Sequence, residues 1–247
     1  MFTPATPLTV PESPFLLAAG ITPGSPLLAW CQFDKQHWQA DLHQRWQLPL
    51  PATLANAVIK RKSEHLASRW LAREVMTQFG VPDFVLLNTA DRSPCWPAGV
   101  QGSLSHSHDM AVIAATREPL SVGIDVEQMM AANTAQETAD MLMNAEERAL
   151  LQQLALPFAM GATLLFSLKE SVYKALWPQL HQPMEFLQAE LIQLDLTTHT
   201  ARLRLTEDFS AQFNRQTLLQ ARFSQHEQRV VTLVTHPLAG NNGHGAN

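Results

Sequence analysis

The 247-residue sequence predicts an α+β fold made of two halves, each with a long helix packed on a mainly antiparallel sheet. Each half begins with an apolar strand, continues through a long helical segment and ends in several short strands. This order lacks the strict alternation of strand and helix that characterises doubly wound parallel sheets. We assign residues 1–118 to an N-terminal half that opens with a Pro-rich segment, 119–236 to a C-terminal half and 237–247 to a mobile tail.

The N-terminal half is organised around one long helix. Apolar residues recur at helical spacing from Thr53 to Phe79, and Gly80 and Pro82 follow to end the helix. Residues 1–29 are rich in proline and almost uncharged, so an irregular wrap is expected there. The other expected elements are strands over 27–33 and 84–87 and a loop over 91–99.

A hairpin is expected to join the two halves, and the C-terminal half is expected to end in strands. The hairpin pairs strand 110–116 with strand 121–127. Helices are predicted over 134–154 and over 162–177, where Pro178 ends the second helix because proline lacks a backbone donor. Four further strands are predicted over 189–196, 201–205, 217–223 and 230–235.

Composition limits the class of protein. Hydrophobic residues make up 46% of the chain and charged residues 16%, a balance that excludes wholesale disorder. We find no apolar stretch long enough for a transmembrane helix and no basic start of a secretory signal, so a cytoplasmic protein is expected. The net charge of −5 argues against nucleic-acid binding. Cys31 and Cys95 are too few for a disulfide framework or a four-ligand zinc site.

The segment Gly123–Glu127 places two carboxylates on one face of a strand. Side chains two positions apart share a face, so Asp125 and Glu127 project together while Ile124 and Val126 turn into the core. Neighbouring carboxylates repel each other unless a cation lies between them, and oxygen ligands suit Mg²⁺. For this segment alone, a solvated acidic strand end is the alternative.

The segment Phe166–Lys174 places an acid and a base on one side of a helix. Glu170 and Lys174 are four residues apart. Glu170 is therefore a candidate third metal ligand, and Lys174 is a candidate phosphate contact one turn away. An ordinary surface pair of glutamate and lysine is the alternative.

Two upstream segments are candidate anion sites. Residues 102–107 are expected to form a loop whose amides and hydroxyls hold a phosphate, with a histidine beside it. A structural role for that histidine is the alternative. The second segment is a basic ridge on the predicted helix, with residues spaced by four: Arg61, His65, Arg69 and Arg73. Such a ridge could bind a polyanionic ligand, and an ordinary solvated helix face is the alternative.

Together, these segments resemble the motifs of the 4′-phosphopantetheinyl transferases. Gly123–Glu127 followed by Phe166–Lys174 is similar to the paired signature of that family, and Ser105–Ser107 is similar to its surfactin-type branch. Three further segments resemble the enterobactin synthetase component D subgroup: Arg61–Arg69, Pro94–Pro97 and Gly102–His106.

The resemblance implies a pseudo-symmetric fold of two similar halves with coenzyme A bound between them. It implies transfer of phosphopantetheine from coenzyme A to a serine of an apo acyl, peptidyl or aryl carrier protein. Asp125, Glu127 and Glu170 would then hold Mg²⁺, and Lys169 and Lys174 would lie near the phosphates, with Lys174 in direct contact. Five residues would hold the 3′-phosphate and the adenosine: Arg61, Lys62, Arg69, Ser105 and His106.

The transfer chemistry assigns roles within this set. The carrier serine needs a proton acceptor, for which Glu170 is the first candidate and Glu127 the second. Lys174 beside the leaving group stabilises its charge. Where the family has Gly-Lys-Pro, this sequence has Arg92-Ser93-Pro94, so Arg92 is expected to replace the charge of the lysine. We expect a monomer, and a carrier from siderophore or other nonribosomal peptide or polyketide synthesis.

Two other functions are consistent with the same residues. A different Mg²⁺-dependent phosphoesterase built on the three carboxylates would hydrolyse coenzyme A or a nucleotide without a carrier protein. A non-catalytic binder of coenzyme A or of carrier proteins would bind without turnover.

Overall fold

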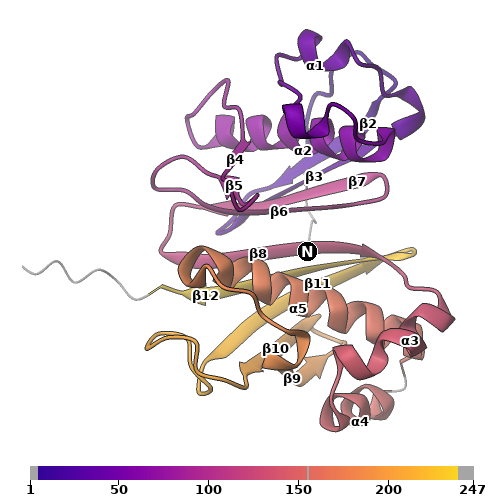
Figure 1. Cartoon of the computed structure of the whole chain (residues 1–247), viewed down its shortest axis with the longest axis vertical. Coiled ribbons are helices and arrows are strands. Elements are labelled where there is room, and N and C mark those ends of the chain that lie inside the picture. The colour runs from indigo at the N-terminus through magenta and orange to yellow at the C-terminus, as the bar shows by residue number, and fades with distance from the viewer. Residues whose placement is uncertain (1–4, 155, 239–247) are drawn as a thin grey trace, which may run out of the picture.

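The computed structural model, which describes residues 5–154 and 156–238, confirms an α+β fold with antiparallel sheets (Figure 1). The described residues form two five-stranded sheets and one small two-stranded ribbon. The first sheet lies entirely before residue 117 and the second entirely after residue 119. None of the helices in these ranges is both long and apolar enough to cross a membrane.

The first sheet carries one long helix on one face. The strand order is β1-β2-β3-β7-β6, and α2 packs on β3 and β7. A short ribbon of β4 and β5 stands apart from the sheet. The bounds of these elements are β1 Thr6–Pro7, β2 Leu16–Thr22, β3 Leu27–Phe33, α1 Leu42–Arg45, α2 Ile59–Gln78, β4 Leu87–Asn88, β5 Pro94–Cys95, β6 Gln101–Ser107 and β7 Met110–Thr116. Two 3-10 turns, η1 Lys35–His37 and η2 Ala52–Leu54, lie before α2.

The second sheet repeats this plan. Its strand order is β8-β12-β11-β10-β9, and α5 packs on β8 and β12. The bounds are β8 Leu120–Gln128, α3 Ala132–Leu142, α4 Ala145–Gln153, α5 Phe158–Leu180, η3 Phe186–Gln188, β9 Ala189–Asp195, β10 Thr200–Leu205, β11 Leu218–His226 and β12 Arg229–Pro237.

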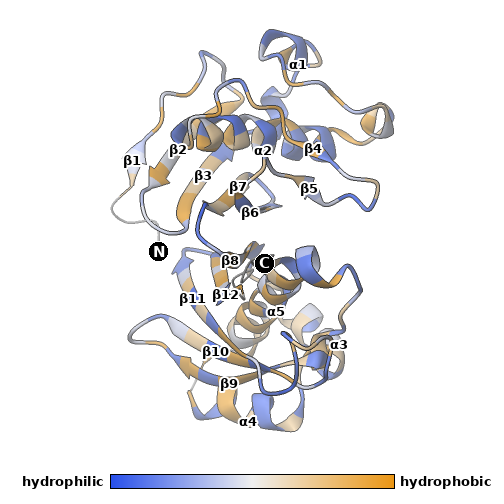
Figure 2. Cartoon of the chain, turned by 90° about the vertical axis from the view of Figure 1, so that its left-hand side faces the viewer, coloured by the Kyte–Doolittle hydropathy of each residue, from blue (hydrophilic) through white to orange (hydrophobic). Residues whose placement is uncertain are grey.

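Three apolar clusters fix the layers as helix, sheet, sheet and helix. One cluster, around Trp70 and Phe33, lies between α2 and the first sheet. A second, around Leu168 and Phe213, lies beneath α5. The third joins the inner faces of the two sheets and includes Ile124. Figure 2 shows the two halves stacked in this way, with hydrophobic residues along the strands of both sheets.

Several sequence-based expectations for strands were wrong. The predicted hairpin of 110–116 and 121–127 does not form, because β3 and β6 already occupy both edges of β7 while β8 pairs with β12. Residues 102–107 lie within strand β6 rather than in a loop. The Pro-rich segment contains β2, which pairs with β3 instead of wrapping irregularly.

Helix boundaries also differ from the predictions. The predicted helix 134–154 is two helices, because the side chain of Asn144 caps the start of α4 in a reciprocal pair of hydrogen bonds with Glu147. Pro178 lies inside the last turn of α5, and the helix ends instead at His181, whose φ of 48° is left-handed. Residues 239–247 of the predicted tail lie outside the described residues.

Candidate active site between the two sheets

One face of β8 carries the acidic residues and lies against α5. Ile124 and Val126 point into the cluster between the sheets, as predicted, so Gly123 and Asp125 face the helix. A Cβ atom at Gly123 would lie 1.9 Å from the Ser171 carbonyl oxygen and 2.6 Å from the Ala175 nitrogen. The glycine therefore permits α5 to approach β8 closely enough for side chains of the helix to reach Asp125.

Asp125 is buried and its carboxylate is held by three side chains from both halves. Ser105 of β6 donates a hydrogen bond to Oδ1 at 2.9 Å, and Ser167 of α5 donates to Oδ2 at 2.8 Å. The Lys174 ammonium lies 2.6 Å from Oδ1 and 2.9 Å from the Ser105 hydroxyl. A buried carboxylate with a cation and two donors is fully compensated, so its position is well defined.

A chain of hydroxyl groups lies behind Asp125. Ser167 Oγ is 2.9 Å from Thr232 Oγ1, which is 2.7 Å from Ser171 Oγ. These groups link β12 to α5 below the carboxylate. They fix the hydroxyl of Ser167, which in turn fixes Asp125.

The three predicted metal ligands share one electrostatic environment. Burial raises the pKa of Glu127 to about 7, and the negative charge of Asp125 adds to this rise against the charge of Lys174. Burial also raises the pKa of Glu170, with Lys174 lowering it and Asp125 raising it. Carboxylates that raise one another's pKa in this way suit a site that is completed by a cation.

The donor chemistry of this cluster fits Mg²⁺, although the geometry is not that of a ready-made site. Three carboxylates supply the oxygen ligands that Mg²⁺ prefers. In the described part of the chain, however, no three His, Cys, Asp or Glu side chains are already arranged to hold a metal ion. The Lys174 ammonium contacts Asp125 instead.

Basic side chains of α2 and β6 lie beside the acidic cluster, but Lys62 is not one of those that the structure brings there. Arg61 is exposed, whereas the Lys62 ammonium lies 5.6 Å from the centre of the Trp38 ring, within the N-terminal half. Desolvation and the positive charges of Lys174, Arg69 and Arg61 lower the pKa of His106. The structure thus brings Ser105, His106, Arg61 and Lys174 together at the junction of the halves.

Two charged residues of this junction were missed by the sequence-based assignment. The Glu64 carboxylate is buried, and it lies 3.5 Å from His106 Nδ1 and 3.9 Å from the Lys60 ammonium. The charge of Lys60 also lowers the pKa of Glu127. Both residues belong to the Lys60–His65 segment that the sequence singled out, so that segment was the available signal.

The structure does not place Arg69 and Lys169 as predicted. The Arg69 guanidinium is buried and donates to the Leu86 carbonyl oxygen and to Asn88. The Lys169 ammonium is buried 2.8 Å from Glu147. Both cations are paired with internal partners, because a charge removed from water requires compensation nearby. In this structure neither cation is directed at a phosphate site.

The prediction of a basic ridge along α2 is also wrong, because most of its residues are not exposed. Besides Arg69, His65 is buried, and burial followed by the charge of Arg69 lowers the pKa of His65 to about 3. Arg73 donates a hydrogen bond to the Trp46 carbonyl oxygen at 2.6 Å. The helix turns this side toward the rest of the N-terminal half, which leaves Arg61 as the exposed member.

Arg92 lies on a loop that crosses from the N-terminal half to α5. It is exposed between the strands β4 and β5 and has a left-handed φ of 70°. The neighbouring Asp91 accepts a hydrogen bond of 3.0 Å from the Trp177 ring nitrogen. This contact holds the loop one turn beyond Lys174, at the rim of the junction.

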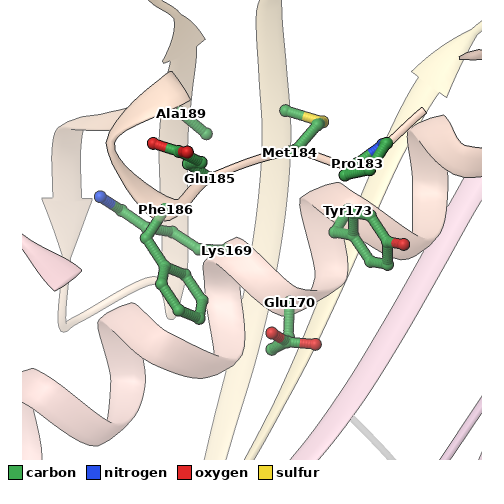
Figure 3. A pocket seen from close by; sticks show the side chains of 8 residues that line it. All are labelled: Lys169, Glu170, Tyr173, Pro183, Met184, Glu185, Phe186 and Ala189. Carbon is green, nitrogen blue, oxygen red and sulfur yellow. The ribbon is translucent and has the colours of Figure 1, made fainter. Parts of the chain in front are cut away.

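A pocket of about 200 Å³ opens beside Glu170 (Figure 3). Its apolar walls come from α5 and from the segment that leads into β9, and they include Tyr173, Met184 and Phe186. Figure 3 shows Lys169 and Glu170 pointing to different sides of α5. The pocket therefore offers an apolar surface next to one of the three carboxylates.

Comparison with known proteins identifies the family. A model of the 4′-phosphopantetheinyl transferase N-terminal domain matches residues 50–116, and one of the 4′-phosphopantetheinyl transferase superfamily matches residues 121–234. The chain is 36% identical over 193 residues to enterobactin synthase component D of Salmonella typhi, covering 78% of this chain and 80% of that protein.

Two further relatives match shorter regions. Enterobactin synthase component D of Escherichia coli (strain K12) is 38% identical over 128 residues, which are 52% of this chain and 61% of that protein. The 4′-phosphopantetheinyl transferase Svp of Streptomyces mobaraensis is 36% identical over 157 residues, 62% of this chain and 63% of that protein. The resemblance seen in the motifs is thereby confirmed. The chain belongs to the 4′-phosphopantetheinyl transferase superfamily, enzymes that use coenzyme A as a substrate.

Proposed function

We propose that this chain transfers 4′-phosphopantetheine from coenzyme A to a serine of an apo carrier protein that serves siderophore synthesis. The relatives named enterobactin synthase component D support the siderophore assignment. The observation that carries the proposal is the Asp125 cluster, in which Ser105 of one half and Lys174 of the other meet on one buried carboxylate. Residues that bind both ends of a pyrophosphate must converge in this way from two elements.

We propose Asp125, Glu127 and Glu170 as the ligands of Mg²⁺. The bound ion would neutralise charge on the pyrophosphate of coenzyme A. The raised pKa values of Glu127 and Glu170 support this assignment, because such carboxylates are stabilised by an added cation. Lys174, whose ammonium contacts Asp125 in this structure, would lie beside the phosphates.

The protein side chains account for the remaining steps. The serine oxygen of the carrier attacks the phosphorus that bears the pantetheine arm, and the bond to the bridging oxygen breaks to release adenosine 3′,5′-bisphosphate. Lys174 stabilises the charge on this leaving group. Glu170 or Glu127 accepts the serine proton, since both carboxylates lie beside the reacting groups in this arrangement.

The adenosine end of coenzyme A and the carrier protein are assigned to different surfaces. Arg61, Lys62, Ser105 and His106 hold the 3′-phosphate and the adenosine, with Arg92 at the rim of the same site. The apolar pocket around Phe186 lies beside Glu170 and is the proposed approach for the carrier protein. A monomeric state and a cytoplasmic location stay predictions.

Intact mass spectrometry of an apo carrier protein tests the proposal. Incubation with this enzyme, coenzyme A and Mg²⁺ should add one phosphopantetheinyl group, and a chelator should prevent the addition. Asp125→Ala and Glu170→Ala should remain folded and lose most activity. Near-normal turnover by either variant would contradict the assignment of these residues as metal ligands. Breakdown of coenzyme A without carrier modification would instead favour a phosphoesterase.

A further inference from the structure

We propose that Glu64 is a positioning residue that holds His106 and Lys60 in place for the 3′-phosphate of coenzyme A. This inference rests on the proposed function, which assigns His106 to that phosphate. Glu64 acts on the site through the two side chains beside it, His106 and Lys60.

Glu64 is well placed to orient both partners. Its side chain is only 9% exposed, and its two oxygens face in different directions. Oε2 lies 3.5 Å from His106 Nδ1 on β6, and Oε1 lies 3.9 Å from the Lys60 ammonium one turn earlier on α2. The His106 ring is 37% exposed and the Lys60 side chain 54% exposed, so both project from a buried acid toward the surface.

The arrangement selects one orientation of the imidazole. A carboxylate beside Nδ1 favours the tautomer whose N–H points at it, and this leaves Nε2 to face the ligand. A ring held on one side presents its other nitrogen to a phosphate at a lower cost in side-chain entropy. The same carboxylate restrains Lys60, whose long side chain is otherwise free to sample many rotamers.

A carboxylate is needed here because there are two donors to satisfy. Gln has the same shape as Glu, but it offers one acceptor oxygen and places an NH₂ group where the other oxygen was. In Glu64→Gln, either His106 or Lys60 therefore meets a donor and turns away. The substitution tests position and charge with little change in volume.

The experiment compares the binding of coenzyme A with that of 3′-dephospho-coenzyme A by titration calorimetry. The ratio of the two affinities measures recognition of the 3′-phosphate and requires no carrier protein. Wild-type enzyme should prefer coenzyme A, and Glu64→Gln should reduce that preference roughly tenfold, the lower range for loss of a supporting carboxylate. Glu74→Gln, a half-buried glutamate beside Arg73 on the same helix, is the matched control and should leave the ratio unchanged.

A double-mutant cycle separates positioning from a general structural effect. If Glu64 acts through His106, the variant carrying both Glu64→Gln and His106→Ala should lose little more preference than His106→Ala alone. Fully additive losses, or an unchanged ratio in Glu64→Gln, would overturn the proposal. If Glu64→Gln does not fold, Glu64→Asp is measured in its place. Its shorter carboxylate should also weaken the preference for coenzyme A, and an affinity ratio equal to that of the wild type would refute the proposal.

Failure of this inference is distinguishable from failure of the proposed function. A wild-type enzyme that modifies a carrier but binds both forms of coenzyme A equally would refute the role of Glu64 and leave the transferase intact. A wild-type enzyme that prefers coenzyme A but does not modify a carrier would refute the transferase. The role of Glu64 would then still be decided by comparing the affinity ratios of the wild type and Glu64→Gln.

Discussion

Substitution of Gly123 by alanine should separate α5 from β8 and disable the site. The added Cβ would lie 1.9 Å from the Ser171 carbonyl oxygen and 2.6 Å from the Ala175 nitrogen, both backbone atoms that cannot rotate away. Relief of the first contact requires roughly 1.5 Å of movement, if a van der Waals separation of about 3.5 Å is restored. The hydrogen bond of 2.8 Å from Ser167 to Asp125 would then exceed its normal range.

The cost has two parts. Overpacking typically destabilises by about 1–3 kcal/mol, and a weakened hydrogen bond to a charged group adds about 1.5–3 kcal/mol. We therefore expect Gly123→Ala to lower the free energy of unfolding by about 2.5–6 kcal/mol. Activity of the remaining folded protein should also fall, because Glu170 and Lys174 on α5 are no longer held beside Asp125 on β8.

Gly161 on α5, the helix that packs against Gly123, provides a control with the opposite sign. A Cβ there would have its nearest contact at 3.4 Å, with the Leu151 side chain. Gly161→Ala should therefore be neutral or stabilise by up to about 1 kcal/mol, because alanine favours a helix interior. Urea denaturation of both variants measures the difference. A Gly123→Ala protein within 1 kcal/mol of wild type would refute this account of the close approach.

Three further changes test other parts of the structure. Lys169→Met should destabilise by about 3–5 kcal/mol because it leaves the buried Glu147 carboxylate without a cation; a stable variant with weak coenzyme A binding would restore the phosphate role. Ser167→Ala should lower the turnover rate roughly tenfold by releasing one oxygen of Asp125, as a carrier-modification time course would measure; an unchanged rate contradicts this. His65 has a pKa of about 3 when folded and an ordinary value of 6.5, so the unfolded state binds more protons as pH falls below 6.5. Between pH 7 and pH 5, wild type should lose about 2 kcal/mol relative to His65→Leu in denaturation experiments; parallel pH curves would contradict this.

Local patterns predicted the elements that carry the site. The spacing of apolar residues located α2 and the centre of α5, since one helix face must be buried whatever it packs on. Strand alternation placed Asp125 opposite Ile124, and the structure confirms that Ile124 faces the core.

Long-range packing decided what the sequence pattern left open. The expected hairpin failed because pairing depends on which strand edges are free, and only the complete sheets determine that. Lys169 and Arg69 were expected at the phosphates because their motifs resemble those of the family. Their neighbours Glu147 and Asn88 come from other elements, and only the folded chain brings them close.

The α+β class and the strand face on which Asp125 lies could be read from residue types and short-range periodicity, and the family from the resemblance of the motifs. The groups that surround the Asp125 carboxylate were visible only in the folded structure. Thr232, whose hydroxyl supports Ser167, lies 65 positions away, and Glu64 reaches His106 only across the helix–sheet contact. Burial and electrostatic compensation act through space, so the partners of a charged group are fixed only when helices and sheets pack together in the folded chain.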